Sequence, residues 1–257
     1  MTMTIYGLLV ASTMQAIRPP RFENERQERL YNYVERNGSV DRRELADVIS
    51  TDETALRESL SALREEGLLE THDGRVRLSI DIGDEVAHEV EEFAYTIRPA
   101  RQSDLGGLVG TMRAVSEEAE YLVAETVVDM LDHEKVVFRN NDLSSRVFFV
   151  ATVDDEVVGW VHLESPNFAK LRHTAELTMG VRPECRGRGI GSNLMERGLH
   201  WAEANGYEKV YQSIPATNQD AIRFLEDHRW ETEAIRRAHF KIDDQYVAEQ
   251  MMAVMLG

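Results

Sequence analysis

A glycine-rich segment in the second half of the chain has the residue types of an anion-binding loop. The segment Arg186-Gly187-Arg188-Gly189-Ile190-Gly191-Ser192 follows an apolar, strand-like run that ends at Val181, and a helical pattern begins within it. Glycines let a backbone approach a ligand closely. The first amides of a helix point outward with the positive end of its dipole. Together with two arginines, such amides can bind a pyrophosphate.

Two common phosphate-binding motifs do not fit this segment. A Walker loop ends in Gly-Lys-Ser or Gly-Lys-Thr, and no lysine is present here. A dinucleotide fingerprint needs a third glycine where this chain has Ser192, and it lies early in a βαβ unit. A glycine turn without a ligand is the remaining structural alternative.

The order Arg-x-x-Gly-x-Gly, directly after Met-Gly-Val-x-Pro, resembles the acetyl-coenzyme A (acetyl-CoA) motif of the GNAT superfamily of N-acetyltransferases. The resemblance extends over about residues 95–256. Residues 95–104 look like the first strand and helix of the family, 147–164 like its strand-turn-strand, and 218–221 like its Asn-x-x-Ala motif. The family implies an α/β fold whose mixed, mostly antiparallel sheet is flanked by helices. It also implies acetyl-CoA as cosubstrate.

The resemblance assigns roles to individual residues. Met179, Gly180 and Val181 would offer backbone groups to the pantetheine arm of acetyl-CoA. Asn218 would hydrogen-bond the cofactor from the opposite side, although an asparagine there can equally cap a helix. The pyrophosphate would be held by Arg186, Gly187, Arg188, Gly189, Ile190, Gly191 and Ser192.

Transfer of an acetyl group to an amine needs a base, because the attacking amine must be neutral. Glu176 lies five residues before Val181 on the same predicted strand, a position that resembles the catalytic glutamate of several family branches. A free glutamate has a pKa near about 4.3, so Glu176 would act through water or from a partly buried position. A glutamate that faces solvent or pairs with an arginine is the alternative. His162, His173 and His239 are backup bases.

The general acid is not where the resemblance would place it. Many members carry a tyrosine seven residues after the asparagine, and this chain has Leu225 there. Tyr211 or Tyr246 would have to replace it from another strand, unless water protonates the leaving thiolate or activity is weak. Cys185 precedes the loop and suggests a covalent route, but no histidine is adjacent to it, so direct transfer is simpler.

Residues 22–80 follow a different pattern, with three short helices and then a hairpin. Ser50 is predicted to cap the third helix, with Glu53 completing a capping box. The order of elements resembles a winged helix-turn-helix domain, in which the third helix, here 52–66, would read DNA. Residues 21–80 contain 10 arginines and 14 acidic residues, whereas a DNA-binding surface is normally basic. DNA binding is therefore one of four possible roles for this domain. The others are dimerisation, for example as a homodimer, ligand sensing, and contact with another protein.

Two further segments complete the predicted organisation. Residues 1–21 are expected to be a tail. Residues 81–94 are predicted to form a linker helix, because Val86, Val90 and Phe93 have helix-like spacing. Residues 95–257 would then be the acetyltransferase domain, and a long helix is expected after Ser103 or Asp104.

The amino-acid composition indicates what broad class of protein this is. The net charge is −17, and only four of the 29 basic residues are lysines, a composition that resembles proteins from organisms with high internal salt. No apolar run approaches about 18 residues, and no basic residue precedes the apolar stretch 5–16. We therefore expect a soluble, cytoplasmic protein with no membrane anchor. Cys185 is the only cysteine, which excludes an internal disulfide and a cysteine-based metal site; we expect no metal.

The sequence thus predicts an enzyme that moves acetyl from acetyl-CoA to a primary amine, on a protein or on a small molecule. The alternative is a transcription regulator that senses acetyl-CoA and binds DNA. Residues 106–142 are expected to help select the acceptor. The acidic residues of this segment could attract a cationic amine, or they could simply form a solvated face. These residues are Glu117, Glu118, Glu120, Asp129, Asp132 and Glu134.

Overall fold

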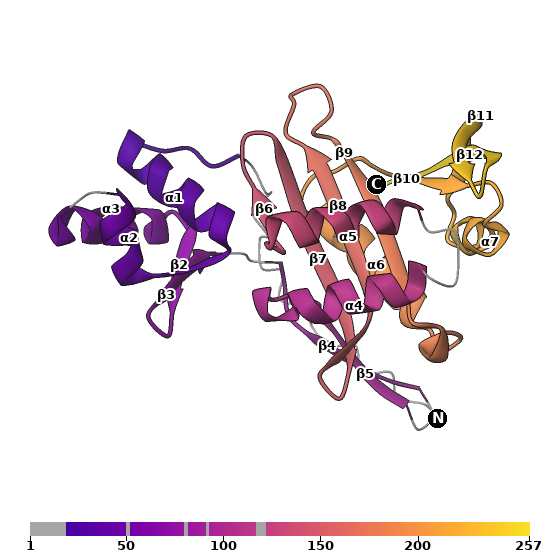
Figure 1. The fold of residues 1–257 in the computed structure, drawn as a ribbon, viewed down its shortest axis with the longest axis horizontal. Helices are drawn as coiled ribbons and strands as arrows, with labels where there is room; N and C mark the ends of the chain where they lie inside the picture. The colour runs from indigo at the N-terminus through magenta and orange to yellow at the C-terminus, as the bar shows by residue number, and fades with distance from the viewer. Residues whose placement is uncertain (1–18, 50–51, 80–81, 91–92, 117–121) are drawn as a thin grey trace.

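The computed structural model describes residues 19–257 except 50–51, 80–81, 91–92 and 117–121 (Figure 1). A small amino-terminal domain lies beside the edge of a larger domain built around one sheet. None of the described helices is long and apolar enough to cross a membrane.

The amino-terminal domain has the predicted order of helices and hairpin. Its sheet has the order β1-β3-β2, and the first, very short strand follows the cap of the first helix. Leucine and valine side chains from all three helices form its core, because their helical spacing places them on one face of each helix. The resemblance to a winged helix-turn-helix domain stays a prediction. The elements are α1 (Glu25–Asn37), β1 (Ser39–Asp41), α2 (Arg42–Ile49), α3 (Glu53–Glu65), β2 (Leu69–His72) and β3 (Arg75–Leu78).

The predicted cap of the third helix is wrong. Asp52 caps α3, and its carboxylate accepts a hydrogen bond from the Ala55 amide at 2.9 Å. Glu53 is therefore the first residue of the helix and not the third, so it cannot complete a capping box. Ser50 lies outside the described residues.

The predicted linker helix is also wrong. Val86–Val90 forms strand β4, which pairs antiparallel with β5 (Phe93–Pro99). Val86 and Val90 lie four residues apart, a spacing that fits one face of a strand as well as one face of a helix. His88 between them stacks on Tyr95 with ring centroids 5.0 Å apart. The large sheet therefore begins before residue 95.

The large domain contains a nine-stranded sheet in the order β11-β12-β10-β9-β8-β7-β5-β4, with β6 paired to β7. Neighbouring strands are antiparallel except β9 and β10, so the sheet is mixed and mostly antiparallel, as predicted. The elements after β5 are η1 (Gln102–Asp104), α4 (Leu105–Ser116), α5 (Leu122–Glu134), β6 (Arg139–Asn140), β7 (Ser144–Val153), β8 (Glu156–Pro166), β9 (Thr174–Val181), η2 (Pro183–Cys185), α6 (Ile190–Ala204), β10 (Lys209–Pro215), α7 (Gln219–Asp227), β11 (Glu231–Ile242) and β12 (Gln245–Met255).

The single long helix expected after Ser103 or Asp104 is replaced by α4 and α5. Asp104 accepts a hydrogen bond from the Arg101 amide and forms a buried ion pair with Arg98, whose nearest nitrogen is 2.6 Å away. Asp104 therefore fastens the start of α4 to β5.

Helices cover both faces of the large sheet. Helices α4 and α5 lie on one face and α6 lies on the other (Figure 1). Side chains alternate along β9, so Ala175 and Leu177 enter the core beneath α6. Glu176 and Thr178 consequently point to the face that carries α5, where both line a cavity beside that helix.

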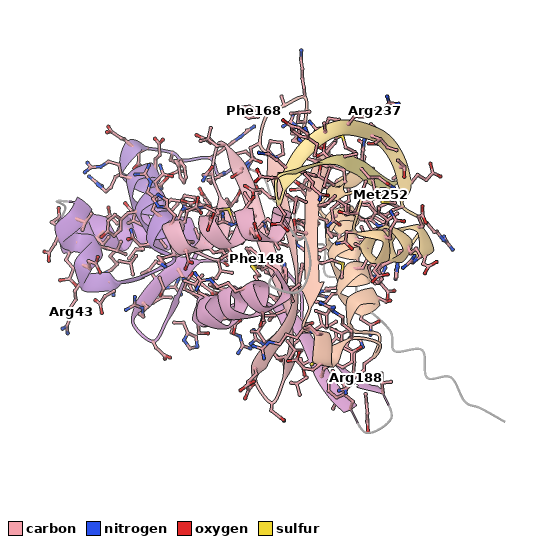
Figure 2. The ribbon with its side chains drawn as sticks, turned by 45° about the vertical axis from the view of Figure 1, so that its right-hand side comes forward. Arg43, Phe148, Phe168, Arg188, Arg237 and Met252 are labelled. Atoms are coloured by element: carbon pink, nitrogen blue, oxygen red, sulfur yellow. The ribbon has the colours of Figure 1, made fainter. Side chains whose placement is uncertain are left out.

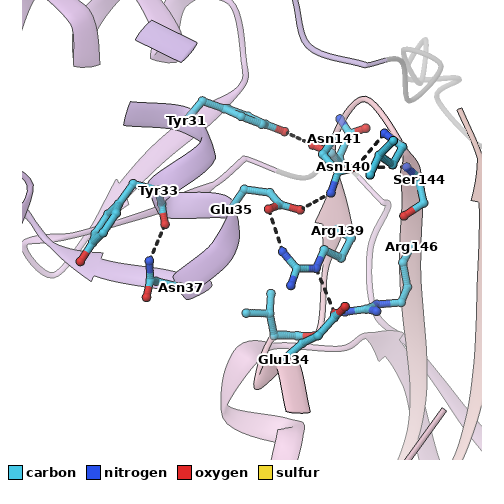
Figure 3. Close-up of polar contacts among 12 residues, drawn as sticks. Tyr31, Tyr33, Glu35, Asn37, Glu134, Arg139, Asn140, Asn141, Ser144 and Arg146 are labelled. Carbon is cyan, nitrogen blue, oxygen red and sulfur yellow. Dashed lines mark hydrogen bonds and ion pairs between the residues drawn. The ribbon is translucent and has the colours of Figure 1, made fainter. Parts of the chain in front are cut away.

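A buried polar network joins the two domains (Figure 3). Glu35 of α1 forms an ion pair with Arg139 at 2.7 Å and accepts a hydrogen bond from Asn141. Arg139 also contacts Glu134, which in turn pairs with the buried Arg146 at 2.6 Å. Because the Glu35 side chain is only 3% exposed, removal of its charge would leave Arg139 poorly compensated.

Replacement of Glu35 by glutamine should lower the free energy of unfolding by about 1–3 kcal/mol, because a charged partner of Arg139 is lost in a buried setting. Urea unfolding followed by circular dichroism would measure this loss. The control is Glu53→Gln, which breaks an exposed pair with Arg57 in the same domain and should change stability little. Equal effects of the two substitutions would contradict a special role for the junction.

Candidate active site

The glycine-rich loop connects the end of β9 to the start of α6. Gly187 and Gly189 have φ angles of +74° and +78°, a region that glycine enters without the strain other residues meet. The backbone turns there so that Gly189 becomes the residue that precedes α6. The side chain of Ile190 is buried in the core, so Ile190 can offer a ligand only its backbone. Unpaired amides of the first helical turn therefore lie directly beside the loop.

The two loop arginines are held in different ways. Arg186 donates from Nε to the carbonyl of Val181 at 3.0 Å, which fastens the loop to the last residue of β9. The guanidinium of Arg188 lies over the ring of Phe93, 4.1 Å from its centroid, at the end of the domain where β5 begins (Figure 2). Both positive groups thus stay beside the helix terminus, a setting that favours a phosphate-bearing ligand.

Strand β9 has a free edge that leads to this loop. Its parallel pairing with β10 ends at Glu176 beside Tyr211. Farther along, Met179 and Val181 pair with β8 on one side, and no described strand pairs with them on the other. Only glycine fits at position 180, because a Cβ atom there would lie 2.3 Å from the ring of Trp160. The opening between β9 and β10 fits an extended ligand arm; the cofactor roles of Met179, Gly180 and Val181 stay predictions.

Asn218 caps α7, and its side-chain oxygen accepts a hydrogen bond from the Ala221 amide at 3.1 Å. The capping alternative is thereby confirmed. A bond from Asn218 to the cofactor stays a prediction.

Glu176 lies in a row of polar residues that crosses the sheet. Arg146 on β7 is paired with Glu164 on β8, Glu164 with Glu176 on β9, and Glu176 with Tyr211 on β10. Side chains of directly paired residues lie on one face, about 5 Å apart at their Cβ atoms. The row therefore brings two carboxyl groups and one phenol together at the end of the β9–β10 pairing.

The surroundings raise the pKa of each of these three groups. Burial raises the pKa of Glu176 most, and the charges of Glu164 and Glu249 raise it further. Burial also raises the pKa of Glu164, against the opposing charge of Arg146. Burial, followed by the charges of Glu176 and Glu164, raises the pKa of Tyr211. Glu176 is consequently a stronger base than a free glutamate.

His162 lies on the same face as this row. Burial and then the charge of Arg146 lower its pKa to about 3, so the ring is neutral near pH 7. The ring stacks on Phe148 with centroids 4.4 Å apart, and neither ring nitrogen has a hydrogen-bond partner. The other two histidines considered as bases, His173 and His239, are exposed and do not line the cavity described next.

A cavity of about 280 Å³ lies between this face and α5. Its apolar wall includes Val127 and Met130 of α5 and Phe240 of β11; its polar wall includes His162, Glu164 and Glu176. The cavity therefore has room for a small group next to the predicted base.

The structure bears on the other residues considered for acid or covalent roles. Leu225 is buried in the core, and Tyr246 is 74% exposed and does not line the cavity, so only Tyr211 of the two tyrosines lies near Glu176. Burial, followed by the charge of Glu184, raises the pKa of Cys185, which keeps it a protonated thiol.

Two of the acidic residues of 106–142 are used in ion pairs within the protein, and the selection of the acceptor by this region stays a prediction. Asp132 pairs with Arg113 and Lys135, and Glu134 pairs with Arg139 and Arg146. Glu117, Glu118 and Glu120 lie outside the described residues. The carboxyl group that the sequence analysis missed is Glu164. Its position opposite Glu176 depends on the register across a long connection, which residue spacing does not reveal.

The fold is that of an α/β domain, and its glycine-rich loop has the features of a site for a phosphate-bearing ligand. Comparison with known proteins makes the class specific, since residues 112–229 match the model of the acetyltransferase (GNAT) family. The Bacillus subtilis protein YwnH, a proposed phosphinothricin acetyltransferase, is 25% identical over 138 residues, which are 52% of this chain and 82% of YwnH.

Solved structures agree on the fold. A GNAT-family acetyltransferase from Streptococcus pneumoniae is 20% identical, with a TM-score of 0.52 over 63% of this chain and 99% of its own. YncA of Salmonella typhimurium, a proposed acetyltransferase solved with acetyl-CoA, is 18% identical, with a TM-score of 0.52 over 63% of this chain and 94% of its own.

The large domain is a GNAT acetyltransferase domain, and the chain is an acetyl-CoA-dependent N-acetyltransferase. Binding of acetyl-CoA along the free edge of β9 and at the glycine-rich loop stays a prediction, which the unpaired edge and the two loop arginines favour.

Replacement of Gly189 by alanine should raise the dissociation constant of acetyl-CoA about fivefold or more, because a side chain at this φ costs about 1 kcal/mol and disturbs the loop amides. Isothermal titration calorimetry would measure it. Gly206→Ala is a matched control, since Gly206 has a φ of +79° but lies beyond the far end of α6. If both variants bind acetyl-CoA like the parent protein, the loop does not hold it.

Proposed function

We propose that this enzyme transfers acetyl from acetyl-CoA directly to a primary amine, with Glu176 as general base. The observation that carries the proposal is the position of Glu176. It lies where β9 and β10 part, beside the free edge that leads to the glycine-rich loop. A half-buried carboxyl group with a raised pKa suits proton transfer near neutral pH.

The proposed reaction forms one bond and breaks one. Bound acetyl-CoA supplies the thioester as an activated acetyl group. The neutral amine attacks the carbonyl carbon, a C–N bond forms, and the C–S bond breaks with its electrons passing to sulfur. Glu176 takes the proton that the amine nitrogen loses, directly or through one water. Backbone amides at the end of β9, near Val181, would stabilise the charge that develops on the carbonyl oxygen.

Tyr211 is the candidate for the acid that protonates the leaving sulfur. It adjoins Glu176 on β10, and its raised pKa keeps the phenol protonated and able to donate. Tyr211 would then take the role of the tyrosine that many family members carry at the position of Leu225.

The acceptor is a primary amine on a protein or on a small molecule. The relationship to YwnH makes phosphinothricin one candidate. The alternative of a DNA-binding regulator gains no support from the described part of α3. There Arg57 pairs with Glu53, and the hydroxyl of Ser61 donates to Glu65.

Substitution of Glu176 by glutamine should lower kcat/KM about 10²- to 10⁴-fold and leave acetyl-CoA binding intact, because only proton transfer is removed. In the parent enzyme kcat/KM should fall as the pH drops through the raised pKa of Glu176, above the range of a free glutamate. A thiol-release assay across pH would measure both effects. The base assignment is refuted if Glu176→Gln keeps both the rate and the acidic limb.

Substitution of Tyr211 by phenylalanine should lower kcat on the order of 10²-fold, since the leaving thiolate would lose its proton donor. The matched control is Tyr246→Phe, which removes an exposed hydroxyl outside the cavity and should leave kcat unchanged. Single-turnover measurements with saturating acetyl-CoA would compare them. An undiminished rate in Tyr211→Phe would mean that water supplies the proton.

A further inference from the structure

The charges of the cavity beside α5 are unbalanced. Glu164 and Glu176 face the same space, and the described residues that line it include no lysine or arginine. The nearest cation in the row, Arg146, is already engaged by Glu134 and by the carbonyl of Val136 at 2.6 and 2.8 Å. Two adjacent carboxylates repel each other when both are ionised. An occupant that brings positive charge would relieve this repulsion.

Neither carboxyl group forms an ion pair with a described lysine or arginine, although the rise that burial causes in the pKa of Glu164 is opposed by the charges of Arg146 and Arg139 and by a hydrogen bond from Ser144. Glu176 has no hydrogen bond or ion pair with a described residue. The closest imidazole nitrogen to Glu164 is that of the neutral His162, at 3.8 Å, which is beyond hydrogen-bond length. The acidic groups are therefore available to a ligand.

His162 is an independent sign of a ligand. Its side chain is buried and lines the cavity, and neither ring nitrogen has a hydrogen-bond partner in the part of the chain that the structure describes. Buried polar atoms are rarely left in this state, because an unmade bond costs about 1–3 kcal/mol. A neutral imidazole has one nitrogen that accepts a hydrogen bond. A ligand N–H group is the complementary donor.

The opposite wall is apolar. Val127 and Met130 of α5 and Phe240 of β11 face the carboxyl groups across the cavity. Methylene groups pack well on such a wall. An acidic group of a ligand would be repelled by the two carboxylates, and the other polar residues of the described lining, His162, Thr126 and Thr178, carry no compensating positive charge.

We propose that the acceptor is a short-chain aliphatic diamine, with its reacting nitrogen at Glu176 and its distal ammonium held by Glu164 and His162. The methylene spacer then packs against Met130 and Phe240. This inference rests on the proposed transfer to an amine and adds the class of amine. It disfavours acceptors that carry acid groups, and it leaves the roles of Glu176 and of the glycine-rich loop unchanged.

Three amines of equal spacer length test the inference: 1,4-diaminobutane, butylamine and 4-aminobutanoate. They end in a positive, an apolar and a negative group, respectively. With the full-length enzyme we expect kcat/KM for the diamine to exceed that for butylamine at least tenfold, which corresponds to about 1.4 kcal/mol. We expect 4-aminobutanoate to be the poorest acceptor.

Glu164→Gln should reduce the ratio of the diamine to the monoamine to less than about threefold, because the partner of the distal ammonium loses its charge. The control is Glu156→Gln, on the same strand but 79% exposed and outside the cavity, which should keep the parent ratio. A preference for butylamine or 4-aminobutanoate, or a ratio that Glu164→Gln does not change, would overturn the inference and leave amine acetylation intact.

Calorimetry with 1,4-diaminobutane separates binding from transfer. Diamine binding that weakens in Glu164→Gln, without turnover of any amine, would support the pocket assignment and reject the proposed transfer. If the diamine neither binds nor reacts while acetyl-CoA still binds, the inference is rejected.

Discussion

The functional geometry depends on one constraint, which is that the pairing of β9 with β10 ends at Glu176, whereas its pairing with β8 runs from Glu176 to Val181. Near Glu176 the strand lies inside the sheet between β8 and β10. Farther on, β10 continues to pair only with β12, and the edge of β9 is left without a partner strand. Unpaired backbone groups are costly when buried. The loss of pairing is therefore a place where an extended ligand can supply hydrogen bonds that the fold does not.

The side chains of β9 alternate between the two faces of the sheet, so one set packs in the core and the other faces the cavity. The strand's odd-numbered residues enter the core beneath α6 and hold the strand in place. Its even-numbered residues Glu176 and Thr178 face α5 and the cavity.

Arg146 stabilises the face of the sheet that carries α5, since its bonds to Glu134 and Val136 connect β7 to the end of α5. Burial opposes ionisation of Glu134, but Arg146 and Arg139 outweigh it and lower its pKa. Through Arg139 the network continues to Glu35, so docking of the amino-terminal domain and support of the site share one set of charges.

Local signals in the sequence identified much of the fold. The glycine pattern predicted the loop and the start of α6, the resemblance of residues 147–164 to a strand-turn-strand predicted the β7–β8 hairpin, and Asn218 marked the start of α7. Non-local features were not accessible in this way. The spacing of Val86 and Val90 fits both a helix and a strand, and only pairing with β5 selects the strand. Glu164 reaches Glu176 through a register that is set beyond a seven-residue connection. Asp132 and Glu134 at the end of α5 are used in ion pairs that composition cannot reveal.

The carboxyl pair has a further consequence for the timing of catalysis. In the absence of a cation, burial raises the pKa of both Glu176 and Glu164, and the charge of Glu164 raises that of Glu176 further, so the two groups titrate as a coupled pair. A cation in the cavity favours the charged form of both groups, because an opposite charge lowers a carboxyl pKa. Binding of a positively charged acceptor would therefore help to ionise the base that must deprotonate it. The contact between Glu164 and Glu176 is unfavourable for the fold alone. It links binding of the acceptor to ionisation of Glu176, which direct transfer requires.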